Sequence, residues 1–93
     1  MLVRAMARWN ISAAGNTVVP AILALEKLGF IVSIERTKDG EQFIATRGDE
    51  TYGADDPVTV LGLVKLVEMR GWEWRSTDPD LERVMRQYTL GTG

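Results

Sequence analysis

The side chains that most often carry catalysis are missing from this sequence or scattered through it. Its 93 residues include no cysteine and no histidine, which excludes thiol catalysis and removes the commonest general base and the usual zinc ligand. Glu35 with Glu73, or Glu41 with Glu50, could be imagined as acid–base pairs, but no spacing fixes a separation suited to hydrolysis. We therefore predict that the protein is not an enzyme and has no catalytic residues, metal site or cofactor.

Three short motifs could bind ions or receptors, and each has a simpler structural interpretation. Asp55 and Asp56 could ligate a hard cation, but they precede Pro57, where acids stabilise a helix N-terminus. The loop 12–16 could present N–H groups to an anion, but it lacks a lysine and does not follow a strand. Residues 47–49 spell the cell-adhesion tripeptide Arg-Gly-Asp, and Gly-Asp also suits a hairpin turn. We favour the structural interpretation in all three cases.

The tryptophans are the most informative candidates for a binding surface. Trp72 and Trp74 follow a predicted helix, and tryptophan is enriched at binding hot spots. Packing in or beside the core is the more frequent fate of this residue, so we expect one of the pair to cover the helix and the other to face outward. Trp9 is similar but has less context. The predicted partner-binding residues are Trp72, Trp74, Asp55, Asp56 and Glu73.

Composition and charge are those of an ordinary globular protein. The chain is 45% hydrophobic and 26% charged, with a net charge of −2, which favours a folded domain over disorder. Nucleic-acid binders usually show a basic stripe, whereas the basic residues here are scattered. The apolar stretches are too short for a bilayer span of about 20 residues, and residues 1–8 lack the apolar region of a signal peptide. We expect a cytoplasmic protein without membrane contact.

Glycine and proline divide the sequence into elements in the order α-β-β-β-α-α. A helix is predicted from Asn16 or Thr17 to a stop at Gly29. Strands follow over 30–36, over 42–47 and around Tyr52. A long helix over 58–70 starts at an Asp cap with proline and ends at Gly71, and a last helix starts at a cap on Asp78 with the stripe Leu81, Val84, Met85 and Tyr88. The prediction is one domain over 1–93, with an arm (1–14), an αβββα core (17–71), a C-terminal helix (79–88) and a frayed tail (89–93).

Two turn signals predict the pairing of the strands. A turn at 39–40 places Arg36 opposite Phe43 and Ile34 opposite Ala45. A turn at 48–49 places Ala45 opposite Tyr52. The two registers agree on one apolar face, which indicates an antiparallel meander with helices on one side, a two-layer α+β sandwich. The side chains on this face are Val32, Ile34, Phe43, Ala45, Tyr52 and Ala54.

The element order over residues 17–71 resembles the double-stranded-RNA-binding fold, which small toxin ribonucleases of toxin–antitoxin pairs also use. RNA-binding members carry a basic cluster at the start of the second helix, where this chain has acids in residues 55–59 that would repel phosphate. The ribonucleases rely on a histidine, and this chain has none. The resemblance supports the fold and counts against both activities. Residues 11–20 and 54–63 also resemble small uncharacterised bacterial proteins that include immunity-type proteins.

The favoured function is a non-enzymatic protein-binding module, of immunity or antitoxin type or a homodimerising accessory protein. The alternative is a nucleic-acid binder that uses Arg36, Lys38 and Arg47. The long helix has more apolar positions than one contact face needs. We therefore expect Leu63, Val64 and Val67 to be buried, and a partner or second copy to cover the remaining apolar flank together with residues 72–74. The alternative cover is the N-terminal arm, folded back through Leu2, Val3, Met6 and Trp9.

Overall fold

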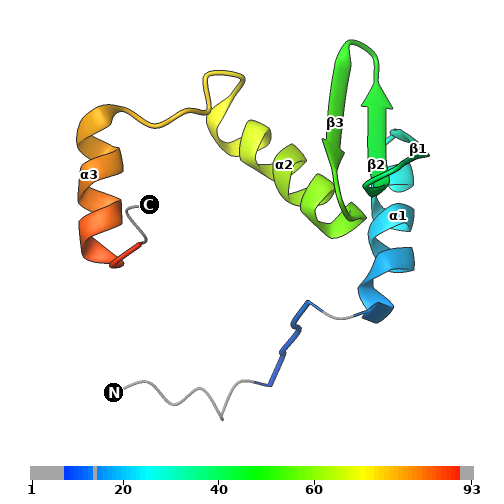
Figure 1. The fold of residues 1–93 in the computed structure, drawn as a ribbon, viewed down its shortest axis with the longest axis horizontal. Coiled ribbons are helices and arrows are strands. Elements are labelled where there is room, and N and C mark those ends of the chain that lie inside the picture. The colour runs from blue at the N-terminus through cyan, green and yellow to red at the C-terminus, as the bar shows by residue number, and fades with distance from the viewer. Residues whose placement is uncertain (1–7, 14, 91–93) are drawn as a thin grey trace. The chain divides into compact units, whose positions relative to one another are not determined.

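The computed structural model describes residues 8–13 and 15–90 (Figure 1), and the chain divides into two compact units, residues 1–63 and 64–93, with the boundary inside one helix. In the described residues the fold is α+β, with three α-helices and an antiparallel sheet in the predicted order α-β-β-β-α-α. The elements are a 3-10 turn η2 (Gly15–Thr17), α1 (Val18–Lys27), β1 (Ile31–Thr37), β2 (Gly40–Arg47), β3 (Glu50–Ala54), α2 (Pro57–Arg70) and α3 (Asp78–Gln87).

Helix α1 is terminated by Gly29, as predicted. Gly29 has φ +95°, a left-handed conformation that glycine adopts without steric cost. Its N–H donates to the Glu26 carbonyl at 2.9 Å, and the Phe30 N–H donates to the Leu25 carbonyl at 3.0 Å. These two bonds form a Schellman motif, in which the residue after the glycine packs back on the helix. Phe30 and Leu25 are both buried, so the cap also anchors the start of β1 in the core.

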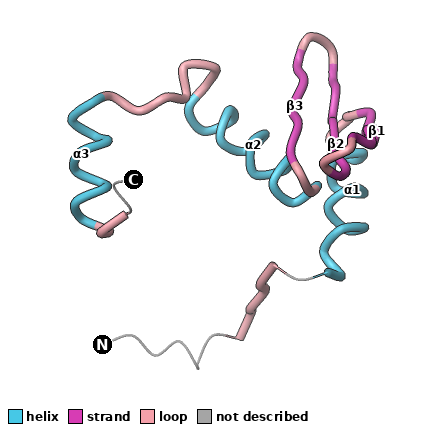
Figure 2. Tube along the Cα trace, viewed as in Figure 1, coloured by secondary structure: helices cyan, strands magenta, loops and turns pink. Residues whose placement is uncertain are grey.

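The sheet has the strand order β1-β2-β3 (Figure 2). Between β2 and β3 the predicted register is confirmed, because Ala45 lies opposite Tyr52 and Phe43 lies opposite Ala54. The turn between these strands places Gly48 at its first central position with φ +58°. A two-residue hairpin turn needs positive φ there, and glycine supplies it.

The predicted register between β1 and β2 is wrong by two residues. Ile34 lies opposite Phe43 rather than Ala45. The reason lies in the turn, where the Thr37 hydroxyl accepts a hydrogen bond from the Asp39 N–H at 3.2 Å and donates to the Gly40 carbonyl at 3.1 Å. These bonds make Thr37 the first corner of the turn. A two-residue shift keeps every side chain on its face, so the predicted apolar face is retained.

The core of the first unit lies between α1 and the inner face of the sheet. The rings of Phe30 and Tyr52 meet edge to face with their centroids 5.6 Å apart, a favourable aromatic geometry. Leu25 and Val60 are completely buried. The predicted apolar face therefore forms the core through its β2 and β3 side chains, whereas on β1 only Val32 is half-buried. Among the described residues of this unit, the buried ones are Ala21, Leu25, Phe30, Phe43, Ala45, Tyr52, Pro57 and Val60.

Helix α2 begins with an Asp cap followed by proline, as predicted. One oxygen of the Asp56 carboxylate accepts the Thr59 N–H at 2.9 Å, and the other accepts the Thr59 hydroxyl at 2.7 Å. These bonds favour the charged carboxylate and hold the pKa of Asp56 below its ordinary value. Pro57 occupies the first helical position, where its missing N–H costs nothing. At the other end Gly71 has φ +79° and terminates the helix.

Burial along α2 is narrower than the sequence predicts. Val60 and Val64 are buried, and they lie four residues apart on one face of the helix. The prediction of burial is confirmed for Val64 but is wrong for Leu63 and Val67, which are half-buried. Met69 is 72% exposed. A helix that is apolar around most of its circumference is therefore fully buried only along the ridge through Val60 and Val64.

Helix α3 starts from Thr77 rather than from the predicted cap at Asp78. The Thr77 backbone is extended, and its hydroxyl accepts a hydrogen bond from the Asp80 N–H at 3.3 Å. The threonine hydroxyl reaches the third N–H of the helix, which is the group a cap must satisfy, so Asp78 and Pro79 become the first two helical residues.

The apolar stripe of α3 is only partly covered. Val84 and Met85 are half-buried, whereas Leu81 and Tyr88 are 47% and 62% exposed. After the helix, Thr89 takes φ +52° and the Leu90 N–H donates to the Met85 carbonyl at 3.0 Å, a second Schellman motif. The predicted frayed tail, 89–93, therefore begins two residues too early, because Thr89 and Leu90 are bonded to the helix. Residues 91–93 lie outside the described residues.

Candidate protein-binding site

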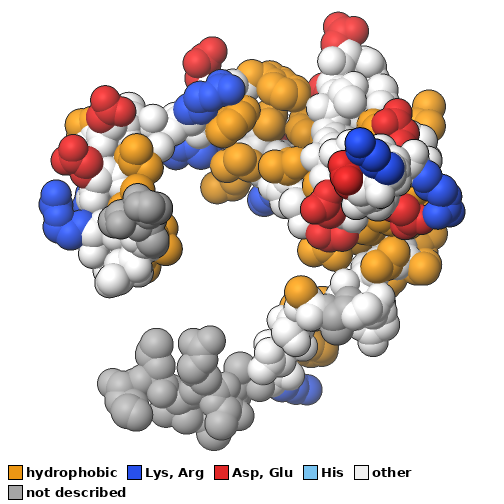
Figure 3. Space-filling view, viewed as in Figure 1, with side chains coloured by type: hydrophobic (Ala, Val, Ile, Leu, Met, Phe, Trp, Pro, Cys, Tyr) orange, Lys and Arg blue, Asp and Glu red, His pale blue; other side chains and the backbone are white. Residues whose placement is uncertain are grey.

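Two exposed tryptophans lie in the segment that follows α2. Trp72 is 55% exposed and Trp74 is 36% exposed. Both indoles are therefore open to solvent, and Trp74 is the more covered of the two. Met69, in the last turn of α2, adds a third exposed apolar side chain, and hydrophobic side chains gather over α2 and the segment after it (Figure 3). We call residues 69–75 the tryptophan segment.

Two arginines hold the tryptophan segment in shape. The Arg70 Nε–H donates to the Trp74 carbonyl at 2.9 Å, which ties the segment back to the end of the helix. The Arg75 guanidinium lies over the Trp74 ring, 4.5 Å from its centroid, a cation–π contact. The indole of Trp74 is thus oriented while it remains open to solvent.

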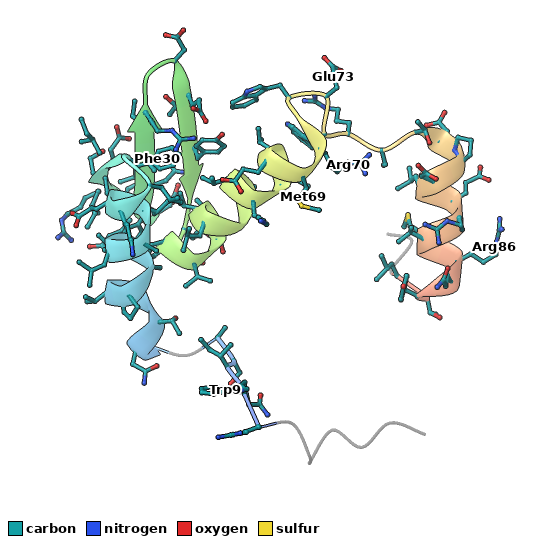
Figure 4. All side chains as sticks on the ribbon, turned by 180° about the vertical axis from the view of Figure 1, so that it is seen from behind. Trp9, Phe30, Met69, Arg70, Glu73 and Arg86 are labelled. Carbon is teal, nitrogen blue, oxygen red and sulfur yellow. The ribbon has the colours of Figure 1, made fainter. Side chains whose placement is uncertain are left out.

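Sequence reasoning missed these two arginines. Their signal was present, because Arg70 stands four residues before Trp74 and Arg75 stands directly after it. The predicted residue Glu73 lies between the two tryptophans and is exposed; Met69, Arg70 and Glu73 are seen together at this end of α2 (Figure 4). The segment therefore has basic groups beside its aromatic ones, and the predicted partner-binding residues did not include them.

The other two predicted partner-binding residues lie in the first unit. Both oxygens of Asp56 accept hydrogen bonds from Thr59, so its carboxylate serves the helix cap. Asp55 is exposed. Among the described residues no group of three or more acidic side chains is arranged to hold a metal ion.

The basic residues proposed for nucleic-acid binding are largely engaged within the protein. Arg47 donates to the Leu28 carbonyl at 2.8 Å and forms an ion pair with Glu50, and its guanidinium lies 4.2 Å from the centroid of the Phe30 ring. These contacts fix the end of α1 to the sheet. The arginine of the Arg-Gly-Asp tripeptide is therefore engaged in contacts within the protein. Arg36 pairs with Glu41.

A hollow of about 760 Å³ lies in the first unit, beside the loop that could have bound an anion. Its lining includes Ile11, Pro20 and Val58, and its polar groups include Ser12 and Asn16. No basic side chain is among the residues that line it. The hollow is therefore apolar in character and does not support anion binding.

Comparisons with known proteins add no functional assignment. Protein-family models, curated protein sequences and solved structures gave no significant match to this chain. Within residues 8–13 and 15–90, none of the helices has the length and apolar character that crossing a bilayer requires. The tryptophan segment is therefore the feature of the molecule that bears most directly on function.

Proposed function

We propose that this protein is a non-enzymatic protein-binding module that acts in the bacterial cytoplasm, and that the tryptophan segment is its contact surface. The observation that carries the proposal is the pair of exposed tryptophans, one of them oriented by an arginine on its ring. An immunity, antitoxin or accessory role fits a small module of this kind.

The composition of the segment supports a protein partner. Tryptophan, arginine and methionine are among the residue types enriched at protein interfaces, and tryptophan and arginine are enriched at binding hot spots. The segment combines all three within residues 69–75. Because Arg75 already orients the Trp74 ring, less side-chain entropy is lost when a partner binds. The complementary surface is an apolar pocket for the indoles with an acidic rim for the guanidinium groups.

The nucleic-acid alternative has weaker support. Its affinity would come from basic groups free to neutralise phosphates. Arg47 and Arg36 are paired with Glu50 and Glu41. Of the three basic residues proposed for this role, only Lys38 forms no ion pair within the described residues. A binding measurement on generic RNA at two salt concentrations tests this alternative, since a protein that binds RNA through its phosphates loses affinity steeply as the salt concentration rises.

The proposed contact surface is tested by removing both indoles. The 93-residue chain and the double variant Trp72→Ala/Trp74→Ala are used to isolate partners from the source cells, and each candidate partner is then purified and titrated by calorimetry. We expect the double variant to bind at least about 30-fold more weakly, because a hot spot contributes about 2 kcal/mol or more.

Trp9→Ala is the matched control, because Trp9 is 83% exposed and lies outside the segment. It should bind the purified partner as the wild type does. A partner whose affinity is the same for the wild type and the double variant would overturn the proposed surface, provided that circular dichroism shows both chains to be folded.

A further inference from the structure

The two edges of the sheet differ in how well they could accept another strand. Strand β2 is central, so β1 and β3 form the edges (Figure 2). β3 has five residues and contains Gly53, whereas β1 has seven residues that pair with β2 without a break. Proteins usually block edge strands by keeping them short or by adding proline or a bulge. β1 is seven residues long and has no proline or bulge, and Glu35 and Arg36 are its two charged side chains, so it is the more open edge.

The backbone of β1 presents a regular row of hydrogen-bonding groups along this edge. In a two-residue hairpin, the residues that flank the turn exchange hydrogen bonds, and the direction then alternates along the strand. Thr37 flanks the turn, so Glu35 and Ser33 also bond toward β2. The N–H and C=O groups of Ile34 and its alternate neighbours therefore point outward. No other strand in the described part of the chain pairs with them.

The side chains of β1 are less covered than those of β2. Ile34 lies on the core face, opposite Phe43, yet it is 45% exposed. Ile31 is 76% exposed on the other face. Apolar side chains left open along a strand that can still accept hydrogen bonds are typical of strand addition.

We propose that β1 pairs with β1 of a second copy of this chain, antiparallel, in a register centred on Ile34. A register centred there is the one symmetric arrangement that pairs all seven residues. It places no like charges directly opposite each other, whereas the register centred one residue later would place Glu35 opposite itself. The opposite pairs are Ile31 with Thr37, Val32 with Arg36, Ser33 with Glu35, and Ile34 with Ile34.

The same arrangement determines on which face of the joined sheet the two α1 helices lie. The two-fold axis is perpendicular to the joined sheet, so both α1 helices lie on the same face of that sheet. Val19 and Leu23 of α1 are 64% and 58% exposed, and Leu28 at its C-terminus is 42% exposed. Val19 and Leu23 are each two residues from the buried Ala21, so they lie on the opposite side of the helix and point away from the sheet, outside the paired edge. This association is independent of the tryptophan segment, which lies in the other unit.

A single introduced cysteine tests the register, because the chain has no cysteine of its own. Across a hydrogen-bonded antiparallel pair the Cα atoms are about 5.5 Å apart, within the range of about 4.4–6.8 Å that a disulfide spans. Ile34→Cys should therefore form a covalent dimer under mild oxidation. Lys38→Cys is the control, since its two copies would lie more than about 20 Å apart at the far ends of the paired strands. Equal cross-linking of both variants, or none at Ile34→Cys, would overturn the proposal.

A second variant tests the association without a covalent bond. Sedimentation equilibrium of the wild type should show a dimer at high micromolar concentration. Ile34→Lys places two ammonium groups opposite each other at the axis and should raise the dissociation constant more than about tenfold. Trp72→Ala/Trp74→Ala should leave the dimer intact, which separates this proposal from the proposed function. A monomeric wild type, or a dimer that Ile34→Lys leaves unchanged, would rule the edge pairing out.

Discussion

The two units of this chain are stabilised in different ways. The first unit encloses a core that includes the fully buried Leu25 and Val60, and Val64 is the one buried residue among the described part of the second. Helix α3 has no buried residue despite its regular apolar stripe. It is held by the Thr77 cap, by the motif at Thr89 and by a hydrogen bond from Arg83 to Gln87. An apolar stripe thus specifies a helix but does not by itself ensure that the stripe is covered.

The two units also use one structural motif with different residues. Both α1 and α3 end in a Schellman motif, with Gly29 at the left-handed position in one and Thr89 in the other. Glycine takes this conformation without cost, whereas a β-branched residue is strained there. The first unit therefore combines burial with an unstrained cap, and the second relies on local bonds and includes a strained one.

The largest difference in stability should come from replacing one leucine in each unit with alanine. Leu25→Ala should lower the free energy of unfolding by about 2–5 kcal/mol, because it opens a cavity in a filled core. Leu81→Ala removes the same atoms from a half-exposed site and should change the free energy of unfolding by less than about 0.5 kcal/mol. Urea titrations followed by circular dichroism measure both. Similar shifts for the two variants would mean that the second unit has a core comparable to the first.

Two arginines of the first unit should differ by a smaller amount in how much they contribute to stability. Arg47 bonds to the Leu28 carbonyl, pairs with Glu50 and covers the Phe30 ring. Arg47→Ala should cost about 1–2 kcal/mol through the lost hydrogen bonds and cation–π contact. Arg36→Ala removes an exposed ion pair and should cost less than about 1 kcal/mol. The urea midpoints of the two variants provide the comparison, and equal midpoints would show that the Arg47 contacts add nothing beyond a surface pair.

The two helix caps should respond to substitution in opposite directions. Thr89→Gly should stabilise the end of α3 by up to about 1 kcal/mol, since it relieves the left-handed strain. Gly29→Ala should destabilise α1 by about 1 kcal/mol or more for the same reason. Hydrogen exchange of the last-turn amides in each helix reports the two effects separately. Faster exchange in α3 of Thr89→Gly would show that the threonine makes a stabilising contact there.

The sequence predicts the elements well because their ends are fixed locally. Gly29, Gly71 and the Asp-Pro pair before α2 determine where the helices stop and start through their own backbone preferences. The face of the sheet was also predictable, because the alternation of side chains survives the two-residue error in register. That error arose because Asp39-Gly40 is a strong turn signal, and the Thr37 hydroxyl moved the turn by one residue.

The candidate site could be predicted only in part. Trp72 and Trp74 stand out by residue type, but whether an indole is buried depends on the chain around it. Arg70 and Arg75 act through a carbonyl and a ring face, contacts that depend on the path of the segment after Gly71. That path is a tertiary feature, and the spacing of the residues does not determine it.

Lowering the pH should destabilise the first unit more than the second. We expect this to be the smallest of the predicted effects. Arg47 and the Tyr52 hydroxyl donate to the Glu50 carboxylate and hold the pKa of Glu50 below its ordinary value of 4.5. The unfolded chain then binds more protons than the folded one in this range, so stability falls with falling pH. The contribution of Glu50 should be complete above pH 4.5 and should be lost as the pH drops through the lowered value. Asp56 acts in the same direction, whereas the Thr77 hydroxyl that caps α3 does not titrate there.

Urea midpoints followed by the near-ultraviolet circular dichroism of buried Tyr52, measured from neutral pH down to pH 3, should decline less steeply in Glu50→Gln than in the wild type. Parallel curves for the two proteins would show that the ion pair with Arg47 does not stabilise the fold, and the difference between the units would then rest on burial alone.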